Sequence, residues 1–218
     1  MTNFRTLAEG QSSQIWIGGP DPTEPQLLFE TRDILVEAPN WALDGASLLV
    51  NGDGALWRLD LGHPGRGLTR VPFDGLPDLN NDHILDPDGE HIYKSAGDGH
   101  IYRGALTGGT VRRATPDDGK WHFLHGMSPD GKRLVTSDTV DWFPHLSPDA
   151  RHATYLAFPA GTVGHPADLD IEVRVVASSD WSTPLRRYPL YGGQGTINVN
   201  SWSPDSRRFA FVAYPVSR

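Results

Sequence analysis

The chain has no cysteine among its 218 residues. This absence excludes a disulfide framework and any zinc site built on thiolates. Basic residues are also scarce, since 19 Lys and Arg stand against 27 Asp and Glu and give a formal net charge of −8. An acidic chain of this kind is a poor match to the phosphate backbone of a nucleic acid. We therefore expect no nucleic-acid partner.

Long apolar runs are missing as well. No stretch approaches the roughly 18 consecutive apolar residues that indicate a membrane-spanning helix. The first ten residues contain no apolar segment of the kind found in signal peptides. The sequence therefore predicts a cytoplasmic protein with no membrane partner. The Gly-x-Ser-x-Gly elbow of α/β-hydrolases is absent too, which excludes a peptidase of that class.

Turn-forming and aromatic residues are abundant instead. The chain contains 24 Gly and 18 Pro, and 10% of its residues are aromatic. Disordered chains are poor in aromatic residues, so the composition indicates a folded protein. Many turn formers together with many aromatic residues are typical of short strands joined by tight turns.

A short Pro-Asp-Gly motif recurs along the chain. Pro fixes φ at the first turn position and Asp-Gly closes a tight turn, so each copy is expected to join two strands of a hairpin. An apolar or aromatic run follows each copy. The five copies, some of them degenerate, are Leu43–Gly45, Pro87–Gly89, Pro129–Gly131, Pro148–Ala150 and Pro204–Ser206.

The spacing of these turns defines a longer repeat. The aspartates of the first three copies lie 44 and 42 residues apart. Residues 51–61 and 96–106 match almost position by position and add a second hairpin to each unit. Four strands in 42–44 residues are typical of a β-propeller blade. The sequence therefore predicts an all-β propeller of four-stranded antiparallel blades; a β-sandwich with similar turns is the alternative.

About five blades fit into a single domain over residues 1–218. The aspartates of the third and fourth copies are only 19 residues apart, so one blade is expected to be truncated. Either a thin blade closes the ring, or an incomplete ring pairs with a second copy of the chain as a homo-oligomer. Two strands at each terminus are expected to share a blade and close the ring. The expected blades are 37–76, 80–116, 121–138 (truncated), 140–191, and 196–218 together with 12–32.

The turn motifs also resemble those of a known family. The strings Trp202–Ser206 and His125–Gly131 are similar to the Pro-Asp repeats of TolB-like propellers, also called PD40 or WD40-like repeats. The resemblance runs from about Ser12 to Tyr214 and implies a propeller that binds a peptide, a glycan or a protein. TolB itself is a periplasmic binding partner, and the expected lack of a signal peptide departs from that location.

A more distant similarity points to oligogalacturonate lyases, whose propellers hold a central metal ion with His and Gln side chains. Gln194 stands near the position of the family's glutamine, within the matching residues 193–204. Ile197 and Val199 occupy the positions of its histidines. The metal site of that family is therefore not reproduced residue by residue.

Histidines gather on the expected innermost strands, which line the axial tunnel of a propeller. His83 and His125 stand four residues before the proline of their turns, and His145 stands three before. Three imidazoles that meet at the axis would hold a divalent metal ion such as Mn, Zn or Ni. The alternative is that these side chains bind water or a neighbouring carboxylate.

A long insertion, residues 158–170, adds polar candidates. It is rich in Pro and Gly, and loops on a rigid scaffold often carry binding residues. A plain hairpin extension is the alternative. The candidate ligand-binding residues of the tunnel and its mouth are Asp82, His83, His122, His125, His145, His165, Asp168, Gln194 and Asn198.

Two functions are compatible with these features. The first is a TolB-like scaffold whose polar, histidine-containing axial pocket binds a small molecule, a glycan or a protein at the tunnel mouth. The second is a metal-dependent lyase or hydrolase that acts on a saccharide or another small polar substrate. No complete catalytic constellation stands in the sequence, so no residue is assigned a catalytic role.

Overall fold

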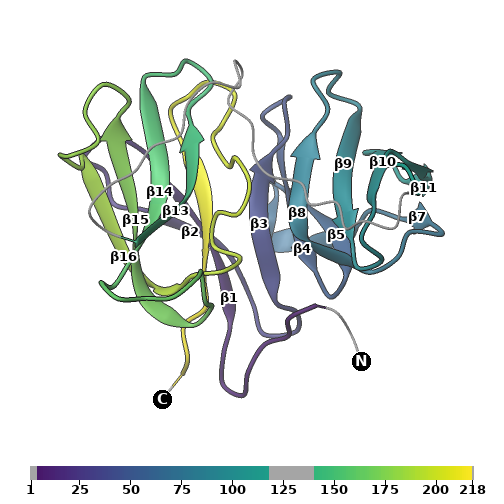
Figure 1. Ribbon diagram of the computed structural model, residues 1–218, viewed down its shortest axis with the longest axis horizontal. Coiled ribbons are helices and arrows are strands. Elements are labelled where there is room, and N and C mark those ends of the chain that lie inside the picture. Colours follow the sequence, from purple (N-terminus) through teal and green to yellow (C-terminus); the bar gives the residue numbers. More distant parts are fainter. Residues whose placement is uncertain (1–3, 118–139, 218) are drawn as a thin grey trace.

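The computed structural model describes residues 4–117 and 140–217. These residues form β-sheets with one short 3₁₀ turn, η1 (Pro64–Arg66), so the predicted all-β fold is confirmed (Figure 1). No helix in the described ranges is long and apolar enough to cross a membrane.

Three sheets are four-stranded antiparallel meanders, as expected for propeller blades. In each, the first strand of the chain lies at one edge and the last at the other. The first sheet contains β3 (Val36–Trp41), β4 (Ser47–Gly52), β5 (Ala55–Asp60) and β6 (Leu68–Arg70). The second contains β8 (Leu79–Leu85), β9 (His91–Ala96), β10 (Ile101–Ala105) and β12 (Arg112–Arg113), and the third contains β13 (Val140–Leu146), β14 (His152–Phe158), β15 (Leu169–Ala177) and β16 (Arg186–Gly192). A short parallel pair, β7 (Phe73–Asp74) and β11 (Gly109–Thr110), links the segments that follow β6 and β10.

The fourth sheet joins the two ends of the chain. Its strand order is β17 (Phe209–Ala213), β1 (Ser13–Gly18) and β2 (Gln26–Thr31). β17 and β1 pair antiparallel over their length, from Gln14 opposite Ala213 to Gly18 opposite Phe209. The prediction that the terminal strands share a blade is therefore confirmed. We call this the terminal sheet.

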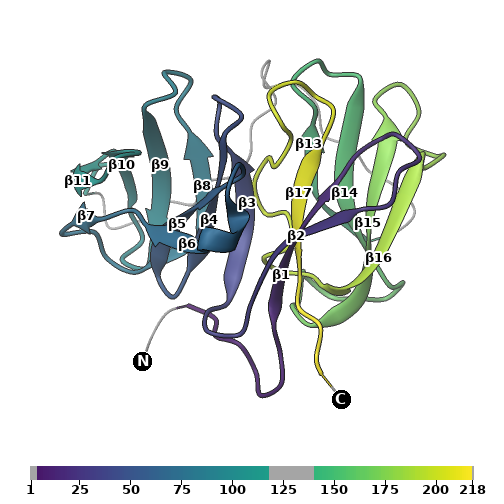
Figure 2. The same cartoon turned by 180° about the vertical axis from the view of Figure 1, so that it is seen from behind.

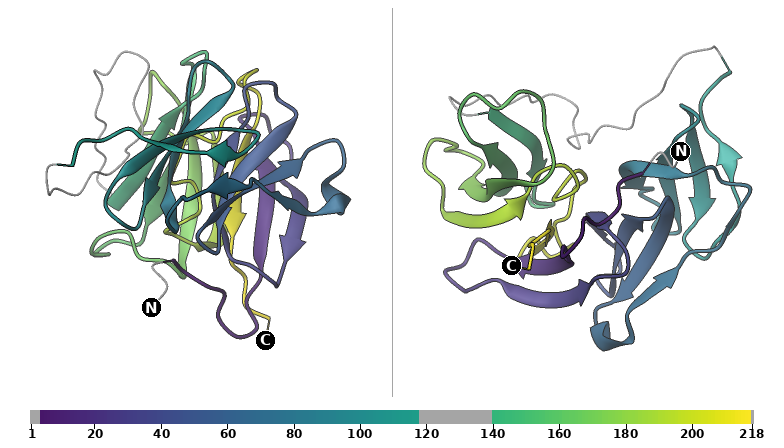
Figure 3. Two further views of the ribbon diagram at one scale, coloured as in Figure 1. Left: turned by 90° about the vertical axis from the view of Figure 1, so that its right-hand side faces the viewer. Right: turned by 90° about the horizontal axis from the view of Figure 1, so that it is seen from below.

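The four sheets follow one another around an axis (Figure 3). The second sheet contacts the first through β8 and β3, the first contacts the terminal sheet through β3 and β17, and the terminal sheet contacts the third through β17 and β16. The segment that connects the second sheet to the third includes the expected truncated blade at 121–138. That blade lies outside the described residues, so it stays a prediction, as does the homo-oligomer.

The Pro-Asp-Gly turns have the geometry that their residues predict. Gly45 and Gly89 have φ of 74° and 72°, in the left-handed region that glycine tolerates. Ala150 occupies the same turn position in the fourth copy, with φ of 57°. A side chain in this region strains the backbone, so the turn geometry prevails over local preference there.

Large clusters of apolar residues pack between neighbouring sheets. Trp41, Leu48 and Val212 belong to a buried cluster between the first and terminal sheets. Trp202 and Phe209 belong to another, between the terminal and third sheets. Neighbouring blades thus bury apolar faces against each other, which is how a propeller forms its core.

Candidate functional site

The inner strands of the three four-stranded sheets share a local irregularity. The pairing register shifts between Glu37 and Asn40 in β3, between Leu79 and His83 in β8, and between Trp142 and His145 in β13. Such a bulge bends the strand and re-aims the side chains beside it. In β3 the bulge places Ala38 at φ 53°, and its N–H donates to the carbonyl oxygen of Gly195 at 2.7 Å.

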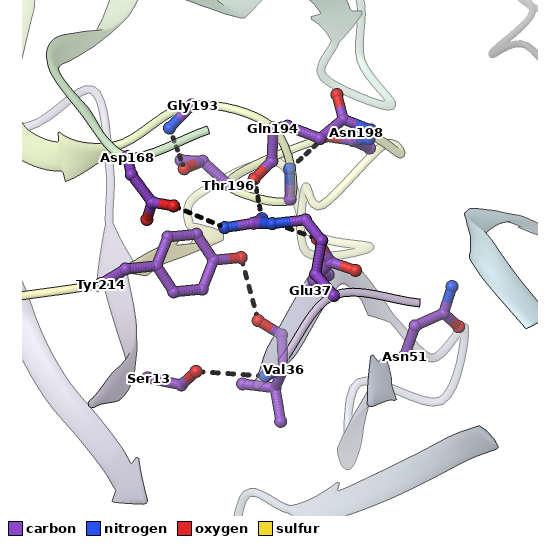
Figure 4. A network of polar contacts seen from close by, with 12 residues as sticks. Ser13, Val36, Glu37, Asn51, Asp168, Gly193, Gln194, Thr196, Asn198 and Tyr214 are labelled. Atoms are coloured by element: carbon purple, nitrogen blue, oxygen red, sulfur yellow. Dashed lines mark hydrogen bonds and ion pairs between the residues drawn. The ribbon is translucent and has the colours of Figure 1, made fainter. Parts of the chain in front are cut away.

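Glu37, beside this bulge, binds an arginine from the start of the chain. Arg5 Nη1 donates to Glu37 Oε1 at 2.8 Å and to the carbonyl oxygen of Gln194 at 2.6 Å. Arg5 Nη2 lies 3.5 Å from Asp168 Oδ2. Three distant parts of the chain therefore converge on one guanidinium group, within the network that Figure 4 shows.

The aromatic ring of Tyr214 lies against this guanidinium group. Arg5 Cζ lies 5.0 Å from the centroid of the Tyr214 ring, within the range of a cation–π contact. The Tyr214 hydroxyl donates to the carbonyl oxygen of Val36 at 3.0 Å, and burial raises its pKa well above the ordinary value. Tyr214 is therefore a fixed, neutral surface for the cation. We call Glu37, Asp168, Tyr214 and the Gln194 carbonyl the guanidinium cage.

A second layer holds Asp168 in position. Gln11 Nε2 donates to Asp168 Oδ1 at 2.7 Å and to the carbonyl oxygen of Tyr214 at 3.3 Å. Asp168 has φ of 61°, a conformation that aspartate tolerates better than most residues. The insertion predicted to carry binding residues therefore does bring one carboxylate to this network.

The cage has an excess of negative charge. Burial raises the pKa of Glu37, while Arg5 lowers it in part and the nearby carboxylates of Asp82 and Asp168 raise it further. Asp53 lines the adjoining pocket, and burial raises its pKa as well. One arginine thus faces several carboxylates, an environment that favours a cation.

A small pocket of about 180 Å³ lies beside the cage, at the inner strands β3 and β8, and we call it the axial pocket. Its lining includes Arg5, Glu37, Asn51, Asn80 and Gln194. The side-chain oxygen atoms of Asn51 and Gln194 are buried and have no hydrogen-bond partner within the described ranges. Asn51 Nδ2 donates to the carbonyl oxygen of Asn80. A buried amide oxygen without a donor costs free energy, so Asn51 and Gln194 each hold an acceptor beside the pocket that the described residues leave unsatisfied.

Four of the residues predicted from the sequence belong to this region. Asp168 and Gln194 contact Arg5 directly. Asn198 accepts a hydrogen bond from the N–H of Gly195 at 2.8 Å, and its Nδ2 atom has no partner in the described part of the chain. Asp82 lies close enough to Glu37 to affect its pKa.

The predicted histidines lie elsewhere. His145 is buried and donates from Nε2 to the carbonyl oxygen of Ile197 at 2.8 Å, and burial lowers its pKa to about 4. His165 is exposed and packs its ring against Trp142, with centroids 4.6 Å apart. His122 and His125 lie outside the described residues.

His83 is fully buried opposite Lys94 of β9. Neither ring nitrogen of His83 nor Lys94 Nζ has a hydrogen-bond partner within the described ranges. Burial, with a smaller contribution from Lys94, lowers the pKa of His83 to about 3, and burial lowers that of Lys94 to about 7. Lys94 Nζ lies 3.5 Å from the centroid of the Phe73 ring. Burial therefore disfavours the charged form of both groups.

No group of three or more metal-ligating side chains forms among residues 4–117 and 140–217. His125, one of the three predicted ligands, is outside these ranges, so the metal site stays a prediction.

Sequence reasoning missed the central members of the network. Arg5, Glu37, Asn51 and Tyr214 were not among the predicted residues. Glu37 carried a signal, because a lone carboxylate interrupts the apolar residues just before the first turn motif. Arg5 stands in a segment without a strand pattern, and nothing in the sequence indicated that it belongs to the site.

The blades, their turns and the shared terminal sheet define a β-propeller built from TolB-like repeats. No family model matches the chain. The uncharacterized protein Atu1656 of Agrobacterium fabrum is 30% identical over an alignment of 264 positions, which covers 87% of this chain and 88% of that protein. A solved Agrobacterium tumefaciens structure described as a candidate TolB has a TM-score of 0.82 at 28% identity and covers 94% of this chain and 99% of the other. The chain belongs to this family of TolB-like β-propellers.

A weaker likeness joins the chain to an oligogalacturonate lyase in complex with manganese, with a TM-score of 0.36 at 12% identity over 82% of this chain and 59% of the lyase. That score is too low to support an argument about function. The alignment with Atu1656 is more informative, because its 264 positions exceed the 218 residues of this chain. The relative therefore contains a stretch of residues, or several, with no counterpart here.

Proposed function

We propose that this propeller is a binding module whose axial pocket takes a ligand with a cationic group, a guanidinium or a primary amine. The observation that carries the proposal is Arg5 itself, because the cage already holds a guanidinium. Glu37 and the Gln194 carbonyl accept its hydrogen bonds, and Tyr214 faces its charge. The same groups would bind the cation of a ligand.

Arg5 is an occupant that a ligand can replace. It comes from residues 4–12, which lie before the first strand, and its side chain is 26% exposed. An entering ligand would also meet the unpartnered oxygen atoms of Asn51 and Gln194, which accept hydrogen bonds from the N–H groups of an amine or guanidinium. The ligand would thus satisfy acceptors that Arg5 leaves unpaired.

The metal-dependent lyase or hydrolase remains the alternative from the sequence. No observation on the described residues favours it, since the carboxylates of the cage are bound to an arginine and the predicted histidines His83 and His145 are buried apart from them. Binding of a cation is the simpler use of this chemistry.

The test is calorimetric titration of the protein with N-acetyl-arginine amide and with its uncharged citrulline analogue. Arg5→Ala is expected to bind the arginine probe at least tenfold more tightly than the unchanged protein, because the competing side chain is gone. Glu37→Gln is expected to weaken binding about tenfold, as loss of a charge-assisted hydrogen bond requires. Arg32→Ala, a variant of an exposed arginine whose guanidinium contacts Gly10 and Ser217, is the matched control. Equal affinity of the Glu37→Gln variant and the unchanged protein, or equal binding of both probes, would refute the proposal.

A further inference from the structure

A second cavity lies on the outer side of the ring, between the third sheet and the terminal sheet. Its volume is about 710 Å³, which is in the range of ligand-binding clefts. β16 forms one wall, and β1 and β17 form the other. Figure 2 labels these three strands. None of its lining residues belongs to the axial pocket. We call this cavity the peripheral groove.

The peripheral groove is elongated. Its wall includes every residue from Pro184 to Tyr191, a length of roughly 25 Å at the usual rise of a strand. Hydrogen bonds between the two blades join its walls. Tyr188 Oη donates to the carbonyl oxygen of Gly19 at 2.8 Å, and the N–H of Tyr214 donates to the carbonyl oxygen of Tyr191 at 2.8 Å. This shape suits an extended chain better than a compact molecule.

Aromatic side chains and prolines line the groove. Trp16 and Tyr191 are half-buried and leave part of their rings accessible, while Tyr188 and Phe211 form the buried base. The prolines of the lining are Pro25, Pro184, Pro189 and Pro215. Grooves lined by aromatic rings are the usual binding sites of proline-rich segments in the polyproline II conformation.

The free edge of β16 is unsuited to binding a peptide as an added β-strand. β16 is the last strand of its sheet in the described part of the chain, so one of its edges has no paired strand. Pro189 stands in the middle of this strand and has no N–H to donate to a ladder. A peptide in the groove therefore cannot extend the sheet as a regular added strand, which favours recognition through side chains.

The charge of the groove points to an acidic residue in the ligand. Arg186 donates to the carbonyl oxygen of Thr23 at 3.2 Å but has no carboxylate partner within the described ranges. Arg187 binds Glu172, which Arg174 also binds. Glu24 is the one carboxylate in the lining. The groove is therefore locally positive, although the chain as a whole has a net charge of −8.

From these features we infer that the peripheral groove binds an extended, proline-containing peptide segment that carries an acidic residue. Its prolines pack on Trp16 and Tyr191, and its carboxylate pairs with Arg186. The site goes beyond the axial pocket and does not depend on the function proposed for that pocket.

Fluorescence polarisation with a labelled hexapeptide library of the form Pro-x-x-Pro-Glu-x tests the inference. We expect saturable binding of some members, with at least tenfold loss when Lys replaces Glu in the same peptide. Arg186→Glu is expected to weaken the best peptide at least tenfold and to bind its Lys form instead. Arg70→Glu, on β6 of the first sheet, serves as the charge control.

Trp16→Ala tests the aromatic wall in the same assay, with its melting temperature measured in parallel because Trp16 also packs against the core. The inference is overturned if no library member binds, or if the best peptide binds the Arg186→Glu protein as tightly as the unchanged one. Binding that survives replacement of both fixed prolines by Ala would overturn the polyproline assignment.

Discussion

The guanidinium of Arg5 lies 2.8 Å from the carboxylate of Glu37, which is almost completely buried. Residues 4–12, which precede the first strand, are thereby held against β3 beside its bulge. A buried carboxylate with a single cationic partner is sensitive to loss of that partner, because the charge that is left must be desolvated without compensation. The pair therefore links the stability of the ring to the occupancy of its pocket.

Arg5→Ala is expected to destabilise the protein by about 2 kcal/mol at pH 7, less than a fully buried pair would lose because Arg5 is partly exposed. The raised pKa of Glu37 fixes the sign of the pH dependence. A carboxyl whose pKa is raised in the folded state binds a proton more tightly there, so the loss should shrink as the pH falls toward 5. Chemical denaturation of both proteins at pH 5 and pH 7 measures this. In the double variant Arg5→Ala with Glu37→Gln, the loss of stability should be smaller than for Arg5→Ala alone. An equal loss would contradict the argument that the uncompensated charge of Glu37 causes it.

Ala150→Gly is expected to stabilise the fourth turn by about 0.5–1 kcal/mol. Ala150 has φ of 57°, and a side chain in this region costs roughly 1 kcal/mol that glycine avoids, partly offset by the greater freedom of glycine in the unfolded chain. Gly45→Ala is the matched reverse change. A Cβ at Gly45 would meet no atom within 4 Å, so its effect reports backbone strain alone. The two variants should shift the free energy of unfolding in opposite directions, and a shift in the same direction would rule out the strain argument.

The fold could be predicted because its signals are local. Asp-Gly turns set the hairpins, and the turn spacing sets the blade, so the sheets and the shared terminal sheet follow from short stretches of sequence. The axial network depends on non-local geometry. Arg5 and Glu37 are 32 residues apart and meet only because the bulge at Ala38 re-aims the end of β3. Asp168 was a candidate because it stands in the insertion 158–170, and Gln194 because it stands near the position of the lyase family's glutamine.

His83 illustrates why alternation alone does not place a side chain. Counting back from its turn assigned this residue to the tunnel, but the pairing register of β8 shifts between Leu79 and His83. A shift of register changes the face on which a side chain lies. The structure accordingly places His83 opposite Lys94, in a fully buried position.

His83→Leu is expected to make the protein more resistant to acid. The pKa of His83 falls from 6.5 to about 3 on folding because the ring is buried beside Lys94. Between these values the unfolded chain binds a proton that the folded chain does not, so this group lowers stability as the pH falls from 6.5 toward 3. The melting temperature of the variant should therefore decline less over this range than that of the unchanged protein. Parallel curves for the two proteins would show that His83 is protonated in the fold.

Lys94→Met is expected to stabilise the protein at pH 7 by about 2 kcal/mol, since a one-unit pKa shift corresponds to about 1.4 kcal/mol and part of the effect is lost to relaxation. Burial lowers the pKa of Lys94 from 10.5 to about 7. The folded chain binds a proton at Lys94 more weakly than the unfolded chain does. The resulting loss of stability is therefore complete below about pH 7 and disappears as the pH rises toward 10.5. Met fills a similar volume without a charge. The difference in free energy of unfolding between the two proteins should thus be largest at pH 7 and should narrow by pH 10.

Arg70→Met, which removes an exposed charge on β6, should give a small difference at both pH values. For Lys94→Met, a difference in the free energy of unfolding that stays constant with pH would mean that burial does not lower the pKa of Lys94 in the fold, and the argument from desolvation would then be wrong.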